Sequence, residues 1–122
     1  MASAYCLAWN AYAPYAVAAF YAENARLVIN NDKPIVGRGS IAAVAIYFYA
    51  QFPDLEFRML DLRSSGTKTV FSWEWSGTYS ETGRTCAISG WDEWTLSSKF
   101  RITESFSWFD AADYHRQVHG TD

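Results

Sequence analysis

The second half of the chain alternates apolar and polar residues with a period of two. Successive side chains on a β-strand point to opposite faces, so this alternation is typical of strands that bury one face. Short polar turns separate the alternating stretches, and connections of a few residues join antiparallel neighbours. The sequence therefore predicts four consecutive antiparallel strands, over residues 55–63, 68–77, 85–96 and 100–109.

The first half of the chain lacks this alternation and is rich in alanine and large apolar residues. Pro14 suits the first turn of a helix, Ser40 is a favourable N-cap, and Asp110 can cap a last helix over 111–118. The other elements predicted are helices over 2–12, 14–23 and 41–51 and short strands over 26–29 and 35–36. Helices followed by a meander indicate a single α+β domain over residues 1–122, in which a bent sheet closes over the helices as a cone.

Composition and charge exclude several classes of function. The formal net charge is −3 and the ten Lys and Arg residues are scattered, so we expect no nucleic-acid partner. Charged residues or proline interrupt every apolar run well before the roughly 20 residues of a membrane span, and no basic leader is present. We expect a cytoplasmic protein, in which Cys6 and Cys86 are either free thiols, which we favour, or one disulfide.

One acidic residue stands out on the predicted strand 85–96. The strand face that carries Trp94 is apolar except for Asp92. A lone buried charge costs several kcal/mol, so such a carboxylate is either paired or functional. Two interpretations stay open: Asp92 forms a structural pair with Arg26, Arg58 or a tyrosine, or it acts chemically with a pKa raised by desolvation.

Aromatic residues make up 18% of the sequence, more than a core of this size usually needs. We expect several of them to line one apolar pocket that holds a small apolar or aromatic ligand: Trp9, Phe20, Phe48, Trp73, Trp75 and Trp94. Plain core packing of these side chains is the alternative. Trp91 falls on the opposite face of its strand, which predicts a homodimer formed through the outer face of the sheet.

The order of these elements and several short phrases resemble the SnoaL-like family of the nuclear transport factor 2-like superfamily, which also holds ketosteroid isomerase, scytalone dehydratase and limonene epoxide hydrolase. The phrases are AFYAENARL at 19–27, VGRGSI at 36–41, FPDLEF at 52–57, WEWSGT at 73–78, and FSWFD at 106–110 followed by RQ at 116–117. The resemblance covers nearly the whole chain. It implies a curved antiparallel sheet around helices, an internal pocket, and dimers through the outer sheet face, but no single activity.

The resemblance also assigns roles to individual residues. Asp92 stands where ketosteroid isomerase has the acid of its oxyanion hole, a protonated carboxyl that donates a hydrogen bond, and Tyr5 stands where it has the oxyanion-hole tyrosine. The general base of the isomerase falls at Ile29 or Asn30, and neither side chain accepts a proton. Steroid-type isomerisation is therefore disfavoured.

Other activities of the superfamily lack their residues as well. Gly90 stands where the epoxide hydrolase has an arginine, and Ser107 stands where the antibiotic cyclases have an acid on the last strand. The dehydratase uses histidines in its pocket, whereas His115 and His119 lie near the C-terminus of this chain. We expect that pair to be a solvated surface feature rather than a metal site.

We therefore expect a small-molecule pocket protein, an enzyme of the cyclase, isomerase or hydrolase type that uses no metal and no cofactor. The expected catalytic residues are Asp92, as the acid, and Tyr5. The expected substrate-binding residues are Trp9, Phe20, Asn30, Phe48, Trp73, Trp75, Trp94 and Ser107. Two alternatives remain open: a non-catalytic module that binds a hydrophobic ligand, and a protein–protein adaptor. An open pocket that reaches Asp92 favours the enzyme, and a pocket filled by tryptophan favours the adaptor.

Overall fold

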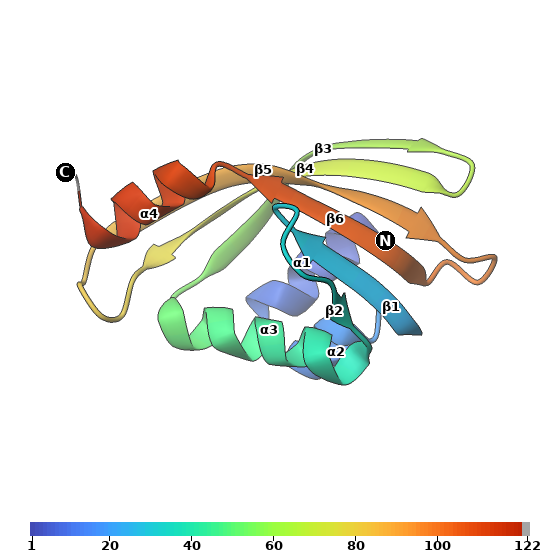
Figure 1. The fold of residues 1–122 in the computed structure, drawn as a ribbon, viewed down its shortest axis with the longest axis horizontal. Coiled ribbons are helices and arrows are strands. Elements are labelled where there is room, and N and C mark those ends of the chain that lie inside the picture. The colour runs from blue at the N-terminus through green and yellow to red at the C-terminus, as the bar shows by residue number, and fades with distance from the viewer. Residues whose placement is uncertain (121–122) are drawn as a thin grey trace.

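A curved sheet with helices against its concave face forms the body of the computed structural model, which describes residues 1–120 (Figure 1). The strands are β1 (Tyr21–Ile29), β2 (Ile35–Val36), β3 (Glu56–Ser65), β4 (Lys68–Thr78), β5 (Thr85–Leu96) and β6 (Ile102–Phe109). Their order across the sheet is β2-β1-β6-β5-β4-β3. Strands β3 to β6 pair antiparallel with their neighbours in sequence, which confirms the predicted meander.

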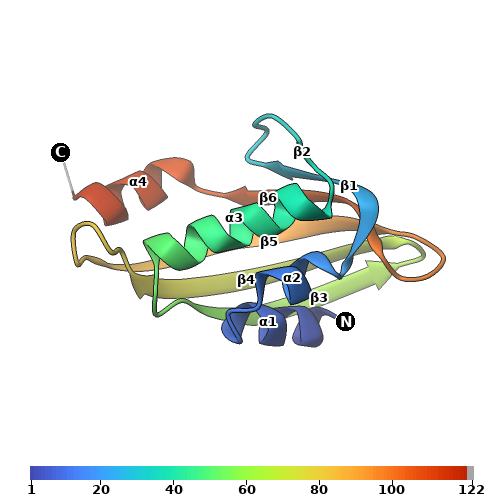
Figure 2. The same cartoon turned by 90° about the horizontal axis from the view of Figure 1, so that it is seen from below.

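Helices α1, α2 and α3, whose bounds follow, lie under the concave face, as the view from below shows (Figure 2). The helices are α1 (Ala2–Asn10), α2 (Pro14–Ala18), α3 (Arg38–Gln51) and α4 (Ala111–His119). The last of these, α4, follows β6 at one end of the sheet (Figure 1). Asp110 caps α4 as predicted, because its side chain accepts a hydrogen bond of 3.0 Å from the backbone N–H of Asp113.

The boundary between α2 and β1 differs from the prediction. The helix ends at Ala18 rather than at residue 23, and the strand begins at Tyr21 rather than at Arg26. Tyr21 pairs in parallel with Ile102 of β6, and the register then shifts before regular pairing resumes at Arg26. Such an irregularity breaks the alternation of side chains, so the sequence pattern missed the first half of β1.

Two smaller predictions are wrong. Ser40 is not an N-cap, because α3 begins two residues earlier, directly after Gly37. Gly37 has a φ of 89°, a backbone conformation that strains any residue with a side chain. Strand β6 starts at Ile102 rather than at residue 100, because Phe100 turns the chain with a φ of 60°.

One face of the sheet is buried and the other is exposed, as the alternation predicts. Phe71, Trp73 and Trp75 of β4 are all buried on the concave face against the helices. On the outer face, Trp91 of β5 is 44% exposed and packs beside Trp108 of β6, with ring centres 6.5 Å apart. Aromatic side chains of the meander therefore lie both in the interior of the cone and on its outer face, where Trp91 is exposed and Trp108 is partly buried.

The two cysteines are free, buried thiols, as favoured from the sequence. Burial is the main reason that the pKa of Cys6 rises to about 11, which keeps this thiol neutral. In the part of the chain that the structure describes, no helix is long and apolar enough to cross a membrane.

Candidate functional site

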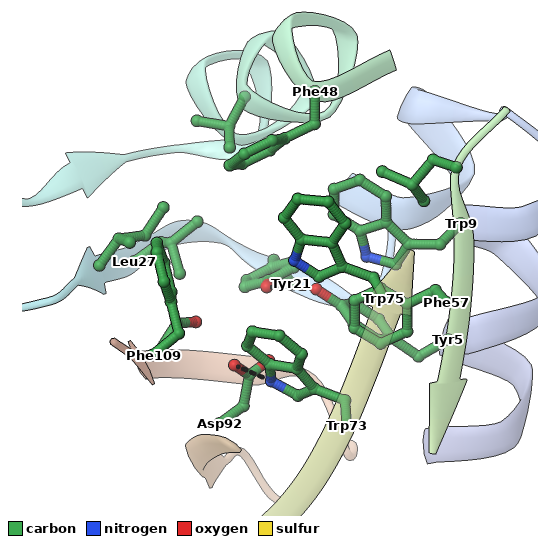
Figure 3. A pocket seen from close by; sticks show the side chains of 14 residues that line it. Tyr5, Trp9, Tyr21, Leu27, Phe48, Phe57, Trp73, Trp75, Asp92 and Phe109 are labelled. Carbon is green, nitrogen blue, oxygen red and sulfur yellow. Dashed lines mark hydrogen bonds between the residues drawn. The ribbon is translucent and has the colours of Figure 1, made fainter. Parts of the chain in front are cut away.

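A cavity of about 70 Å³ lies between the concave face of the sheet and the helices. Fourteen side chains line it (Figure 3). They come from nearly every element of the fold: Tyr5, Trp9, Tyr21, Leu27, Ile29, Val44, Phe48, Leu55, Phe57, Trp73, Trp75, Asp92, Ser107 and Phe109. Because only one of these side chains is ionisable near neutral pH, the chemistry of the cavity centres on Asp92.

Asp92 points from β5 into the cavity and is 4% exposed. The indole Nε1 of Trp73, on the neighbouring strand, donates a hydrogen bond of 2.9 Å to its Oδ1 (Figure 3). Ser107 lies directly opposite on β6. Burial raises the pKa of Asp92 to about 6, and the polar hydrogens of Ser107, Trp73 and Trp94 offset part of that rise. The carboxyl group can therefore take up and release a proton close to neutral pH.

No cation pairs with Asp92 within residues 1–120. Arg58 forms its ion pair with Glu74 instead, and the side chain of Arg26 is exposed. A tyrosine does not bind the carboxyl either, since the Tyr5 hydroxyl shares a hydrogen bond of 2.9 Å with that of Tyr21. The structural pairs considered from the sequence are therefore wrong, and Trp73 is the hydrogen-bond partner.

Tyr5 and Tyr21 form a buried hydroxyl pair beside this carboxyl (Figure 3). Burial is the largest cause that raises the pKa of both phenols, and the negative charge of Asp92 adds to it. Both hydroxyls therefore keep their protons. One hydroxyl donates its proton to the hydrogen bond between them. The pair therefore retains one further O–H donor.

The absence of a side chain at Gly90 makes room for Trp73. A Cβ atom at Gly90 would lie 2.2 Å from the carbonyl oxygen of Trp108 and 2.7 Å from the Trp73 ring. Gly90 pairs with Trp73 across the two strands and is two residues before Asp92 on the same face, so the glycine leaves space for the indole to reach the carboxyl. A larger side chain at position 90 would collide with Trp73.

Seven of the ten predicted site residues line the cavity: Tyr5, Trp9, Phe48, Trp73, Trp75, Asp92 and Ser107. The other three lie outside its lining. Trp94 is 2% exposed and packs behind Tyr5, with ring centres 5.1 Å apart, and Phe20 packs edge-on against the same ring at 5.6 Å. The Asn30 side chain accepts a hydrogen bond of 2.9 Å from the backbone N–H of Phe109. Trp94 and Phe20 therefore support the wall of the cavity, and Asn30 holds the end of β6.

Seven lining residues are not among those predicted from the sequence: Tyr21, Leu27, Ile29, Val44, Leu55, Phe57 and Phe109. Tyr21 was not predicted as a site residue because it fell within the helix predicted over 14–23. Phe57 could have been found, because it falls on the inner face of the predicted strand 55–63 by alternation alone. It stacks on Trp9, with ring planes 10° apart and centres at 5.6 Å.

Metal ligands do not gather anywhere in residues 1–120, since no three His, Cys, Asp or Glu side chains could hold an ion together. His115 and His119 lie beside each other on α4, with ring centres 4.5 Å apart. Both are exposed and neither lines the cavity.

A curved sheet wrapped around helices, with one carboxyl in an aromatic cavity, defines a pocket protein with the fold of nuclear transport factor 2 and ketosteroid isomerase. The family described as SnoaL-like domain matches residues 2–105, so the chain belongs to the SnoaL-like domain family. No curated protein matches it.

Several solved structures share the fold. A candidate SnoaL-like polyketide cyclase from Jannaschia sp. CCS1 is 12% identical, with a TM-score of 0.82 over 94% of this chain and 88% of that one. A candidate polyketide cyclase from Xanthomonas campestris pv. campestris is 19% identical, with a TM-score of 0.81 over 96% and 93%. A ketosteroid isomerase-like protein from Catenulispora acidiphila DSM 44928, in complex with trimethylamine, is 14% identical, with a TM-score of 0.87 over 96% and 90%. At these identities the likeness establishes the fold alone.

Proposed function

We propose that the protein is an enzyme of the cyclase, isomerase or hydrolase type that acts on a small apolar or aromatic substrate, with Asp92 as its acid. The observation that carries this proposal is the buried carboxyl itself, which faces an aromatic cavity and pairs with no cation among residues 1–120. Natural folds rarely keep such a group unless it is used, because its desolvation is costly. The SnoaL-like domain match and the similarity of the fold to candidate polyketide cyclases support an enzyme, and the cyclase class in particular.

The proposed chemistry begins with protonated Asp92. Its pKa of about 6 leaves a fraction of the carboxyl protonated at neutral pH, and an apolar substrate that displaces water raises that fraction further. With Oδ1 held by Trp73, the proton on Oδ2 is available to a carbonyl or to a leaving oxygen. The free proton of the Tyr5–Tyr21 pair then gives the same oxygen a second donor.

The side chain at position 29 limits which reactions fit. Ile29, one of the two positions (with Asn30) where the resemblance puts the base of ketosteroid isomerase, lines the cavity, and an isoleucine takes no proton. A reaction that needs a separate strong base is therefore a poor fit. Better candidates are reactions in which Asp92 itself, or water, takes the proton back.

Conversion of a panel of small aromatic and terpenoid ketones and epoxides tests the proposal. Each compound is first checked for thermal stabilisation of the protein and then for conversion by mass spectrometry. We expect at least one compound to be converted, with Asp92→Asn abolishing conversion and Tyr5→Phe slowing it. Glu93→Gln is the matched control, because Glu93 is the next residue along β5 and is exposed on the opposite face.

Each other outcome of this experiment supports a different function for the protein. Conversion that is unchanged by Asp92→Asn and Tyr5→Phe refutes the proposed mechanism. Stabilisation without conversion supports the non-catalytic binding module. If no compound stabilises the protein, while Trp91→Ala abolishes self-association, the adaptor that works through the outer sheet face is the better description.

A further inference from the structure

A second hollow lies beside the candidate site, between α3 and the edge of the sheet formed by β1 and β2. It is open to solvent, has a volume of about 490 Å³, and is lined by Ile29, Ile35, Ser40, Ala43, Val44, Tyr47 and Phe48. None of these side chains is charged, and two carry a hydroxyl group. We call this hollow the α3 groove.

The α3 groove and the inner cavity share part of their walls. Ile29, Val44 and Phe48 line both. Phe48 extends from α3 into the end of the cavity that lies far from Asp92 (Figure 3). All three shared side chains are only partly buried. The two hollows therefore lie side by side, with these three side chains between them.

The sizes of the two hollows divide the ligand into two parts. The inner cavity, at about 70 Å³, has room for a small polar group beside Asp92 and little more. The groove is several times larger and wholly uncharged, so it suits a hydrocarbon tail. A negatively charged head is disfavoured, because it would face the ionised form of Asp92 at short range.

We propose that the site takes a neutral, elongated ligand whose oxygen-bearing head lies beside Asp92 and whose apolar tail lies in the α3 groove. This inference rests on the proposed function and adds the shape and polarity of the substrate. Val44 and Phe48, which line both hollows, then determine which tails fit.

The dissociation constants of a series of methyl ketones, measured by calorimetry, test the inference. The series runs from 2-butanone through 2-hexanone and 2-octanone to 2-decanone. Each methylene that enters an apolar site strengthens binding by about fourfold, so we expect a gain of at least about a hundredfold from 2-butanone to 2-decanone. Octanoate, which has a similar tail and a charged head, should bind at least about tenfold more weakly than 2-octanone at neutral pH.

Two tryptophan variants of α3 locate the tail. Ala43 is exposed and lines the groove but not the cavity, so Ala43→Trp fills the groove and should reduce the ratio of 2-decanone to 2-butanone affinity by at least about tenfold. Ala50→Trp is the matched control, since Ala50 is exposed on the same helix and lines neither hollow. It should leave that ratio unchanged.

The failures of the two proposals can be told apart. An affinity that does not rise with chain length, or a ratio equally affected by both tryptophan variants, overturns the elongated ligand and leaves the chemistry of Asp92 standing. Absence of binding by every ketone, 2-butanone included, overturns the elongated ligand together with the carbonyl-binding role of Asp92.

Discussion

The exchange of Asp92 for asparagine removes one ionisable group from the cavity and nearly preserves the shape of the side chain. Burial raises the pKa of Asp92 from 3.8 to about 6 in the folded protein. Between these values the folded state binds more protons than the unfolded chain does. Stability from this group is therefore fully present below pH 3.8 and is lost as the pH rises through about 6.

The size of the effect follows from the two pKa values. At about 1.4 kcal/mol for each pH unit between them, the ionised carboxyl lowers the free energy of unfolding by about 3 kcal/mol at high pH. About 2 kcal/mol of this falls between roughly pH 4.5 and pH 7.5. Asparagine does not titrate, so the unfolding free energy of Asp92→Asn minus that of the original protein should grow by about 2 kcal/mol over that range.

Urea denaturation of both proteins at several pH values measures this difference. All other carboxyl groups are common to the two proteins, so their titration cancels in the difference. Glu93→Gln provides the matched control for removal of one carboxyl group, because Glu93 is the next residue and is exposed on the other face of β5. If the difference for Asp92→Asn stays flat with pH, or falls, the raised pKa of Asp92 is wrong and its role as an acid near neutral pH loses its basis.

Two further predictions concern the residues that support the site. Gly90→Ala should destabilise the protein by about 3 kcal/mol and displace Trp73, because the new Cβ would meet the Trp108 carbonyl oxygen and the Trp73 ring. Urea denaturation measures this loss of stability. Gly39→Ala is the control and should be neutral or stabilising, because its added atom meets nothing within 4 Å. Tyr5→Phe should cost about 1–3 kcal/mol by leaving the buried Tyr21 hydroxyl without its partner, and the double change of both tyrosines to Phe should cost less than the sum of the single changes. Additive costs in that double-mutant cycle would contradict the hydroxyl pair.

More of the fold than of the site could be predicted from the sequence. The meander followed from period-two alternation and short turns, because both are local properties of the chain. The same alternation correctly placed Asp92 on the buried face of β5 and Trp91 on the exposed one. The start of β1 did not follow, because its pairing with β6 joins residues far apart in sequence and includes an irregular step.

The sequence by itself determined an α+β chain with one acid on an apolar face, since strand periodicity fixes which side each residue faces. Only the tertiary structure decided which groups meet that acid. Trp73 reaches the carboxyl because Gly90 leaves space for the indole, while Tyr5 turns to Tyr21 rather than to Asp92. Contacts of this kind depend on how distant elements pack, and the pKa of Asp92 depends on the burial that this packing creates.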